Sequence, residues 1–289
     1  MGKQSRRERR AEARKAKKKS RIQYVDRPFE GIEFEADLVA MREIIPSASM
    51  RVKLTEEHGG HELTFVTLLP GMAAALRRND GELLVAMQTV MSSGDVSLDI
   101  AERTLRGVEL APGESFNQTD QPEPGPRLQD ILDLSAPAEL EIHDTYDYWV
   151  DSSEAEKPDV QAAIAQATEQ MVPTAQVPGV KGAYWCRMQR EFVRWVRPEA
   201  EDAVADALAR LQHKRELTFD GSRFVGAFRA AGLLIPVFEL EAGSEADELE
   251  KPMAEFAKKF QAAIDDDAPL SPDERRTRSG IISRQVTLR

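Results

Sequence analysis

The hydrophobic pattern of the first 110 residues predicts short strands with helices between them. Met50 to Leu54 and Glu62 to Leu69 have strand-like patterns, and Gly59-Gly60 in the loop between them favours a hairpin turn. A third strand is predicted from Leu83 to Thr89. Helices are predicted at three segments, Asp37 to Ile45 before Pro46, Met72 to Arg78, and a segment that Asp95 caps and that ends near Arg106.

Apolar residues in the second half recur with the helical period in three segments. Each set places its members on one helix face: Val160, Ile164, Ala167 and Met171; Val204, Ala207, Leu208 and Leu211 after Pro198; and Leu249, Met253, Phe256, Phe260 and Ile264. A short helix is predicted at Leu128 to Leu132, and Ser271 to Glu274 has the form of a capping box for a last helix ending near Gly280.

Strands are predicted between these helices. The segments are Leu140 to Val150, a hairpin over Ala183 to Val196, and Glu216 to Phe219 with Arg223 to Phe228 around the turn Asp220-Gly221, followed by Leu233 to Leu240. The prediction is an α+β fold of two small mixed lobes with mainly antiparallel strands. Both lobes contain a strand, a proline (Pro70 or Pro198) and an alanine-rich segment, so a duplication is an open alternative.

The domain boundaries follow from composition. Residues 111 to 127 contain four prolines and few large apolar groups, which is typical of a linker. The expected organisation is a disordered basic tail (1–25), an N-terminal lobe (26–110), this linker (111–127), a C-terminal lobe (128–268) and a C-terminal helical extension (269–289).

Composition excludes several classes of protein. Cys186 is the one cysteine, so no intramolecular disulfide can form, and no apolar run approaches the length of a membrane span. Basic residues at the N-terminus are not followed by the apolar segment of a signal peptide. We expect a cytoplasmic protein that does not enter a membrane.

Charge is divided unevenly along the chain. Residues 1–21 carry eleven Lys and Arg against two Glu, a net charge of +9, and the other 268 residues carry a net charge of −20. Such asymmetry indicates a polyanionic partner for the tail, namely RNA, DNA or the ribosome. The residues expected to contact nucleic acid are Arg6, Arg7, Arg9, Arg10, Arg14, Lys15, Lys17, Lys18 and Lys19.

Candidate chemistry is sparse. No phosphate-binding glycine loop, dinucleotide motif, zinc helix or nucleophile elbow occurs in the sequence. His58 and His61 lack a third ligand at suitable spacing, so we expect a solvated loop and no metal or cofactor. A lone strand cysteine such as Cys186 is expected to be a small buried hydrophobe more than a nucleophile.

One cluster of ionisable residues remains as a possible acid–base site. If residues 140–150 form a strand, His143, Asp147 and Asp151 share one face and Asp144 lies on the other. The simpler interpretation is an exposed strand with solvated carboxylates, and we favour it.

Five stretches of the chain resemble an uncharacterised actinobacterial family, a domain of unknown function. They are residues 27–49, 183–188 (AYWCRM), 193–211, 224–240 and 273–289. The resemblance covers residues 27–289 and implies an actinobacterial source and a cytoplasmic setting, but no catalytic residues. Some members are labelled preprotein translocase SecA because of an N-terminal zinc module of cysteines and histidine, and this chain lacks those cysteines.

Three hypotheses for function follow. The leading one is a non-enzymatic binding or adaptor protein whose tail contacts nucleic acid or the ribosome and whose acidic body engages an unidentified partner. The first alternative is an enzyme with a site near His143 and Asp147. In the second alternative the tail folds back on the acidic body as an intramolecular regulator.

Overall fold

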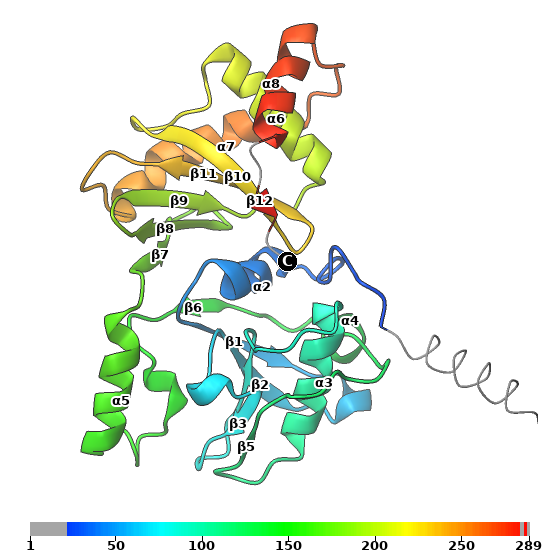
Figure 1. Ribbon diagram of the computed structural model, residues 1–289, viewed down its shortest axis with the longest axis vertical. Coiled ribbons are helices and arrows are strands. Elements are labelled where there is room, and N and C mark those ends of the chain that lie inside the picture. The colour runs from blue at the N-terminus through cyan, green and yellow to red at the C-terminus, as the bar shows by residue number, and fades with distance from the viewer. Residues whose placement is uncertain (1–21, 284–285, 288–289) are drawn as a thin grey trace, which may run out of the picture.

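The computed structural model describes residues 22–283 and 286–287, which form two six-stranded sheets with helices around them (Figure 1). The predicted α+β class with mainly antiparallel strands is confirmed. The tail residues 1–21, predicted to be disordered, lie outside the described residues. Residues 22–25, the last part of the predicted tail, are described, and the Val25 amide donates to the Gly94 carbonyl at 2.9 Å.

The first sheet has the strand order β5-β3-β4-β2-β1-β6. Neighbouring strands are antiparallel except β2 and β4, which are parallel. The strands are β1 (Ala48–Lys53), β2 (Glu62–Val66), β3 (Ala75–Arg77), β4 (Leu83–Ala86), β5 (Ser115–Phe116) and β6 (Leu140–Ile142). A loop with the short helix η1 (Glu56–His58) joins β1 to β2, and Gly59 and Gly60, where the sequence predicts a turn, have positive φ angles of 90° and 62°.

Helix α3 (Val96–Val108) packs against β3 and β4 of the first sheet, and helix α4 (Leu128–Ile131) packs against α3 (Figure 1). Asp95 caps α3 as predicted, because its side chain accepts hydrogen bonds from the amides of Ser97 and Leu98. Arg103 ties α3 to the sheet by donating to the Ala86 carbonyl at 2.6 Å, and burial lowers the pKa of its guanidinium to about 10. Helix α5 (Pro158–Glu169) and the short helix η3 (Asp147–Trp149) cover part of the opposite face.

The second sheet has the order β12-β10-β11-β9-β8-β7. Its strands are β7 (Thr174–Gln176), β8 (Ala183–Arg187), β9 (Glu191–Trp195), β10 (Arg223–Ala230), β11 (Leu233–Glu239) and β12 (Val286–Thr287). Helices α6 (Glu201–Lys214), α7 (Glu250–Ile264) and α8 (Pro272–Ile282), with the short η4 (Asp247–Leu249), lie on one side of it (Figure 1). Ser271 and Glu274 form the predicted capping box of α8.

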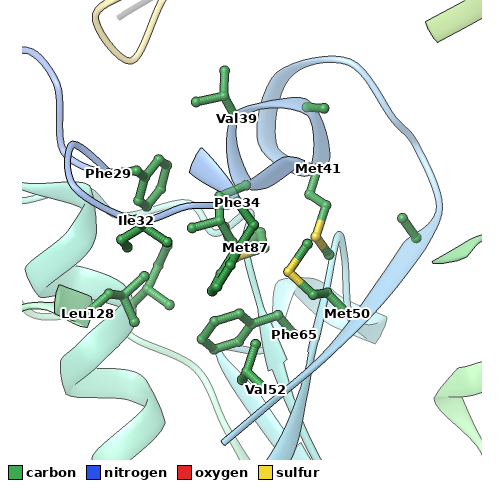
Figure 2. Close-up of a cluster of buried hydrophobic side chains, with 14 of the residues drawn as sticks. Phe29, Ile32, Phe34, Val39, Met41, Met50, Val52, Phe65, Met87 and Leu128 are labelled. Carbon is green, nitrogen blue, oxygen red and sulfur yellow. The ribbon is translucent and has the colours of Figure 1, made fainter. Parts of the chain in front are cut away.

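Helix α2 (Glu35–Glu43) lies between the two sheets (Figure 1). Successive residues of β11 point to opposite sides, so Leu233 and Ile235 join the core around α2, while Leu234 and Phe238 join the core under α6 and α7. Figure 2 shows Met41 pointing toward Met50 of the first sheet, with Val39 on the other side of the helix. One apolar core therefore joins both sheets through α2.

Polar contacts reinforce this junction. The Tyr184 hydroxyl in β8 donates to Asp37 Oδ1 of α2 at 2.9 Å. Arg27 donates to both carboxylate oxygens of Glu35, at 2.7 and 2.6 Å, and to the Pro198 carbonyl at 2.7 Å. A Cβ at Gly232 would lie 2.6 Å from Arg27 Cβ, so the β10–β11 turn needs glycine there for close approach as well as for its φ of +75°.

Three predicted elements are wrong. The segment Met72 to Arg78 is not a helix: Gly71 and Met72 have positive φ angles that end the short helix η2 (Pro70–Met72), and β3 then pairs with β4. The predicted strand from Leu140 to Val150 ends at Ile142 and is followed by η3. Residues 216–219 form no strand, although Asp220 and Gly221 do make the predicted tight turn.

The proline-rich segment 111–127 connects two parts of the first sheet. β5 lies within it, and β6, which follows it, pairs with β1. The change of sheet comes later, between β6 and β7, where α5 lies. Composition misplaced this boundary because prolines also suit an extended chain crossing the surface of a single lobe.

The two sheets resemble each other in strand order but not in strand direction. In the first sheet the β1–β2 hairpin lies beside β4, which is the second strand of the β3–β4 hairpin. In the second sheet the β8–β9 hairpin lies beside β11, which is the second strand of the β10–β11 hairpin. The junction is parallel between β2 and β4 and antiparallel between β9 and β11. Of the two prolines, only Pro198 precedes an α-helix. These differences do not match a simple duplication.

We expect Tyr184→Phe to lower the free energy of unfolding by about 1–3 kcal/mol, because it removes the donor to a half-buried carboxylate. Chemical denaturation followed by circular dichroism measures the change. Tyr24→Phe is the matched control, since the Tyr24 side chain is 66% exposed, and it should change stability by less than about 0.5 kcal/mol. Equal effects of the two substitutions would contradict the role of Tyr184.

Asp37 gives a pH-dependent expectation. Burial raises the pKa of Asp37 above its usual 3.8, against the opposing effects of the Tyr184 hydroxyl and Lys181. The folded protein then binds a proton at Asp37 more tightly than the unfolded chain, so this group's contribution to stability falls as pH rises from 3.8 through the folded-state value. Asp37→Asn should be at least as stable as the parent at neutral pH, and its relative advantage should shrink toward pH 3. A constant difference across this range, in denaturation at several pH values, would exclude the assignment.

Candidate functional site

A polar groove lies on the face of the first sheet that points away from α2. Its volume is about 950 Å³. The side chains of β1 explain it, because Ala48, Met50 and Val52 are buried in the core around α2 while the alternate residues point to the other face. The lining residues are Ser49, Arg51, Val52, Lys53, Glu62, Thr64, Arg78, Glu82, Leu84, Ala136, Pro137, Glu139, Leu140, Glu141, His143 and Tyr148.

The groove is bounded on one side by the other half of this face, which is covered by neighbouring elements. Val66, Leu84 and Ala86 of the sheet pack there against Tyr146, Trp149 and Ile164. This cover comes from η3 and α5, the elements that connect the two sheets. Strands β1 and β2 lie beyond it and carry polar residues where the cover stops.

A serine and a histidine are hydrogen-bonded within the groove. Ser49 Oγ lies 2.7 Å from His143 Nε2. The backbone holds both residues, since Ser49 pairs with Glu141 in the β1–β6 register and the His143 amide donates to the Ser47 carbonyl at 3.0 Å. The two residues are 94 positions apart in the chain.

Two further side chains surround the imidazole. Glu141 Oε1 lies 4.0 Å from His143 Nδ1. The Tyr148 ring lies 5.3 Å from the His143 ring, centre to centre, and the Tyr148 hydroxyl donates to the Leu68 carbonyl at 3.2 Å. Burial raises the pKa of Tyr148, so its phenol stays protonated. The histidine is therefore supported on one side by a fixed aromatic ring.

Charges of both signs line the groove. Arg78 donates to the Tyr148 carbonyl at 3.0 Å and pairs with Asp80 and Glu82. Burial alone would lower the pKa of Arg78, but these carboxylates raise it, and the Arg78 hydrogen bond lowers the pKa of Asp80. Arg51 is exposed, and the described residues offer it no ion pair.

The structure separates the predicted acid–base cluster. His143 lines the groove, whereas Asp144 and Asp147 are exposed and Asp151 is buried, all three outside it. Ser49, which does contact His143, was missed because it lies in a distant strand with no motif around it. The nine basic residues predicted to contact nucleic acid lie outside the described residues.

The other two candidate residues, His58 and Cys186, have surroundings typical of structural residues. His58 Nδ1 lies 2.9 Å from Thr55 Oγ1 within the β1–β2 loop. Cys186 is fully buried in β8, and burial raises the pKa of its thiol, which disfavours the nucleophilic thiolate. Among residues 22–283 no three His, Cys, Asp or Glu side chains are grouped to hold a metal ion.

Comparison with known proteins identifies the family to which the chain belongs. The chain matches the model of DUF5926, a family of unknown function, over residues 28–289. It therefore belongs to that family, as the resemblance to a domain of unknown function predicted. No curated protein and no solved structure matches the chain. In the described part of the chain no helix has the length and apolar character of a membrane span.

We expect Arg78→Ala to destabilise the protein by about 1–3 kcal/mol, because it removes the hydrogen bond that joins the β3–β4 turn to the Tyr148 carbonyl and the ion pairs with Asp80 and Glu82 within that turn. Arg51→Ala is the control in the same groove, and its effect should stay within about 0.5 kcal/mol. Urea denaturation of both variants measures this. A larger loss for Arg51→Ala than for Arg78→Ala would reverse the two roles.

Proposed function

We propose that this protein is a cytoplasmic binding or adaptor protein whose basic tail attaches it to nucleic acid or the ribosome. The division of charge carries the proposal, since residues 1–21 have a net charge of +9 and the remainder −20. A cationic segment gains affinity for phosphates by releasing their counterions, and this attraction requires no catalytic group.

The attachment point of the tail supports this role. Tyr24 is 66% exposed, and the chain at Val25 is fixed to the surface by its bond to Gly94. A chain of 21 residues spans at most about 70 Å when extended. A partner bound by the tail can therefore lie well away from the acidic body, which would repel the same phosphates at close range.

The acidic body also favours a second candidate, in which the tail binds its own body and regulates it. The −20 charge of residues 22–289 is the observation behind it. The two candidates differ in what the tail binds. Loss of RNA binding on deletion of residues 1–21 supports the adaptor, whereas binding of a peptide of residues 1–21 to the deleted protein, with no RNA binding by the full-length chain, supports the regulator.

We expect full-length protein to bind single-stranded RNA without sequence preference and the 1–21 deletion to lose this binding. If about six basic groups neutralise phosphates, the slope of log affinity against log salt is roughly −4, so affinity falls a few hundredfold from about 50 to 200 mM salt. Fluorescence anisotropy with a labelled oligonucleotide measures both quantities.

Two tail variants act as controls. Replacing Arg6, Arg7, Arg9, Arg10, Arg14, Lys15, Lys17, Lys18 and Lys19 by Gln should remove binding, while a tail with the same residues in shuffled order should retain it. Equal RNA binding by the full-length and deleted proteins would refute the tail's role. Absence of binding by either at about 50 mM salt would refute nucleic-acid binding itself.

A further inference from the structure

The Ser49–His143 pair has the geometry of a nucleophile and its general base. The 2.7 Å separation between Ser49 Oγ and His143 Nε2 lies within the range for proton transfer. In the tautomer that accepts from Ser49, the ring proton is on Nδ1, the nitrogen facing Glu141. Nucleophile, base and a carboxylate near the second ring nitrogen are thus placed in one open groove.

The backbone holds both members of this pair. Ser49 lies in β1, which is paired on both sides with β2 and β6, so its position does not depend on a loop. His143 directly follows β6, and its amide donates to the Ser47 carbonyl at 3.0 Å. Side chains on strands hold a reactive geometry more precisely than side chains on loops. Tyr148 packs beside the imidazole and limits its rotation away from Ser49.

Positive charge stands next to the serine. Arg51 and Lys53 follow Ser49 at alternate positions of β1 and so point to the same face. A guanidinium near the attacked carbon stabilises the negative oxygen that forms during acyl transfer. Lys53 is itself paired with Glu56 at 3.3 Å, so Arg51, which has no ion pair with the described residues, is the cation that favours a substrate with a carboxylate or phosphate near its scissile bond.

We propose that Ser49 is a catalytic nucleophile and His143 its general base for the hydrolysis of carboxylic esters that bear an anionic group. His143 takes the Ser49 hydroxyl proton as Oγ bonds to the ester carbon, and the alcohol leaves with that proton as the carbon–oxygen bond breaks. Water then attacks the acyl carbon while His143 takes one of its protons, the carbon–Oγ bond breaks, and His143 returns that proton to Ser49 Oγ as the carboxylic acid leaves. One ester and one water give one acid and one alcohol.

This activity goes beyond the proposed binding function and is independent of it. The tail supplies no group to the reaction, and RNA binding requires neither Ser49 nor His143. Failure of the esterase proposal therefore leaves the tail proposal intact, and the reverse also holds.

The test is covalent labelling of the full-length protein with an alkyl fluorophosphonate, which reacts with activated serines. We expect one label per chain, located at Ser49 by peptide mass spectrometry. Ser49→Ala should abolish the label, and His143→Gln should slow labelling by about 100-fold or more. The exposed residues Ser135 and Asp147 provide controls, because Ser135→Ala and Asp147→Asn should label at the parent rate.

A second measurement protects the test against a variant that fails to fold. The native parent protein should be labelled at Ser49 and the same protein in urea should not, since unfolding separates Ser49 from His143. No label at Ser49 in the native protein would overturn the proposal. So would equal labelling in the native and unfolded states, or a parent labelling rate in folded His143→Gln.

Discussion

The architecture depends on a single short helix that is buried on both sides. α2 has nine residues, and of these Glu35, Ala36, Leu38, Val39, Ala40 and Met41 are buried. A helix covered all round lies inside a core and not on its surface. Because both sheets pack against α2, their relative positions depend on its packing and on the Asp37–Tyr184 bond. A cavity in this core would destabilise the packing of both sheets at once.

Much of the fold follows from local patterns in the sequence. Helices α6 and α7 have their apolar stripes in the expected places, and Asp95 and Ser271 cap α3 and α8 as their side-chain chemistry predicts. The error at Met72 to Arg78 arose because alanine and leucine favour a helix in isolation, while pairing with β4 and β5 decides the outcome in the protein. The β10–β11 turn was missed because Ala231, with a φ of +47°, stands where Asn or Asp is usual.

The groove was harder to predict from the sequence than the fold. His143 could be singled out because it lies among carboxylates and aromatic residues, but its partner depends on the pairing of β1 with β6, which no local pattern encodes. The strand assumed for residues 140–150 also brought Asp147 into the cluster. The chain turns into η3 after Ile142, so Asp147 is exposed and Tyr148 faces the groove instead.

The groove and the division between the sheets have a common origin in residues 143–173. This connection runs from β6 to β7 and, through Tyr146, Trp149 and Ile164, buries one half of the outer face of the first sheet. An open antiparallel sheet can keep its other face in water, and there the sequence has polar residues in place of the apolar ones under α5. The path that carries the chain to the second sheet thus also sets the edge of the groove. It brings Tyr148 against His143 and, through the Tyr148 carbonyl, engages Arg78. The side chains that line the groove therefore depend on the path of residues 143–173 between the two sheets.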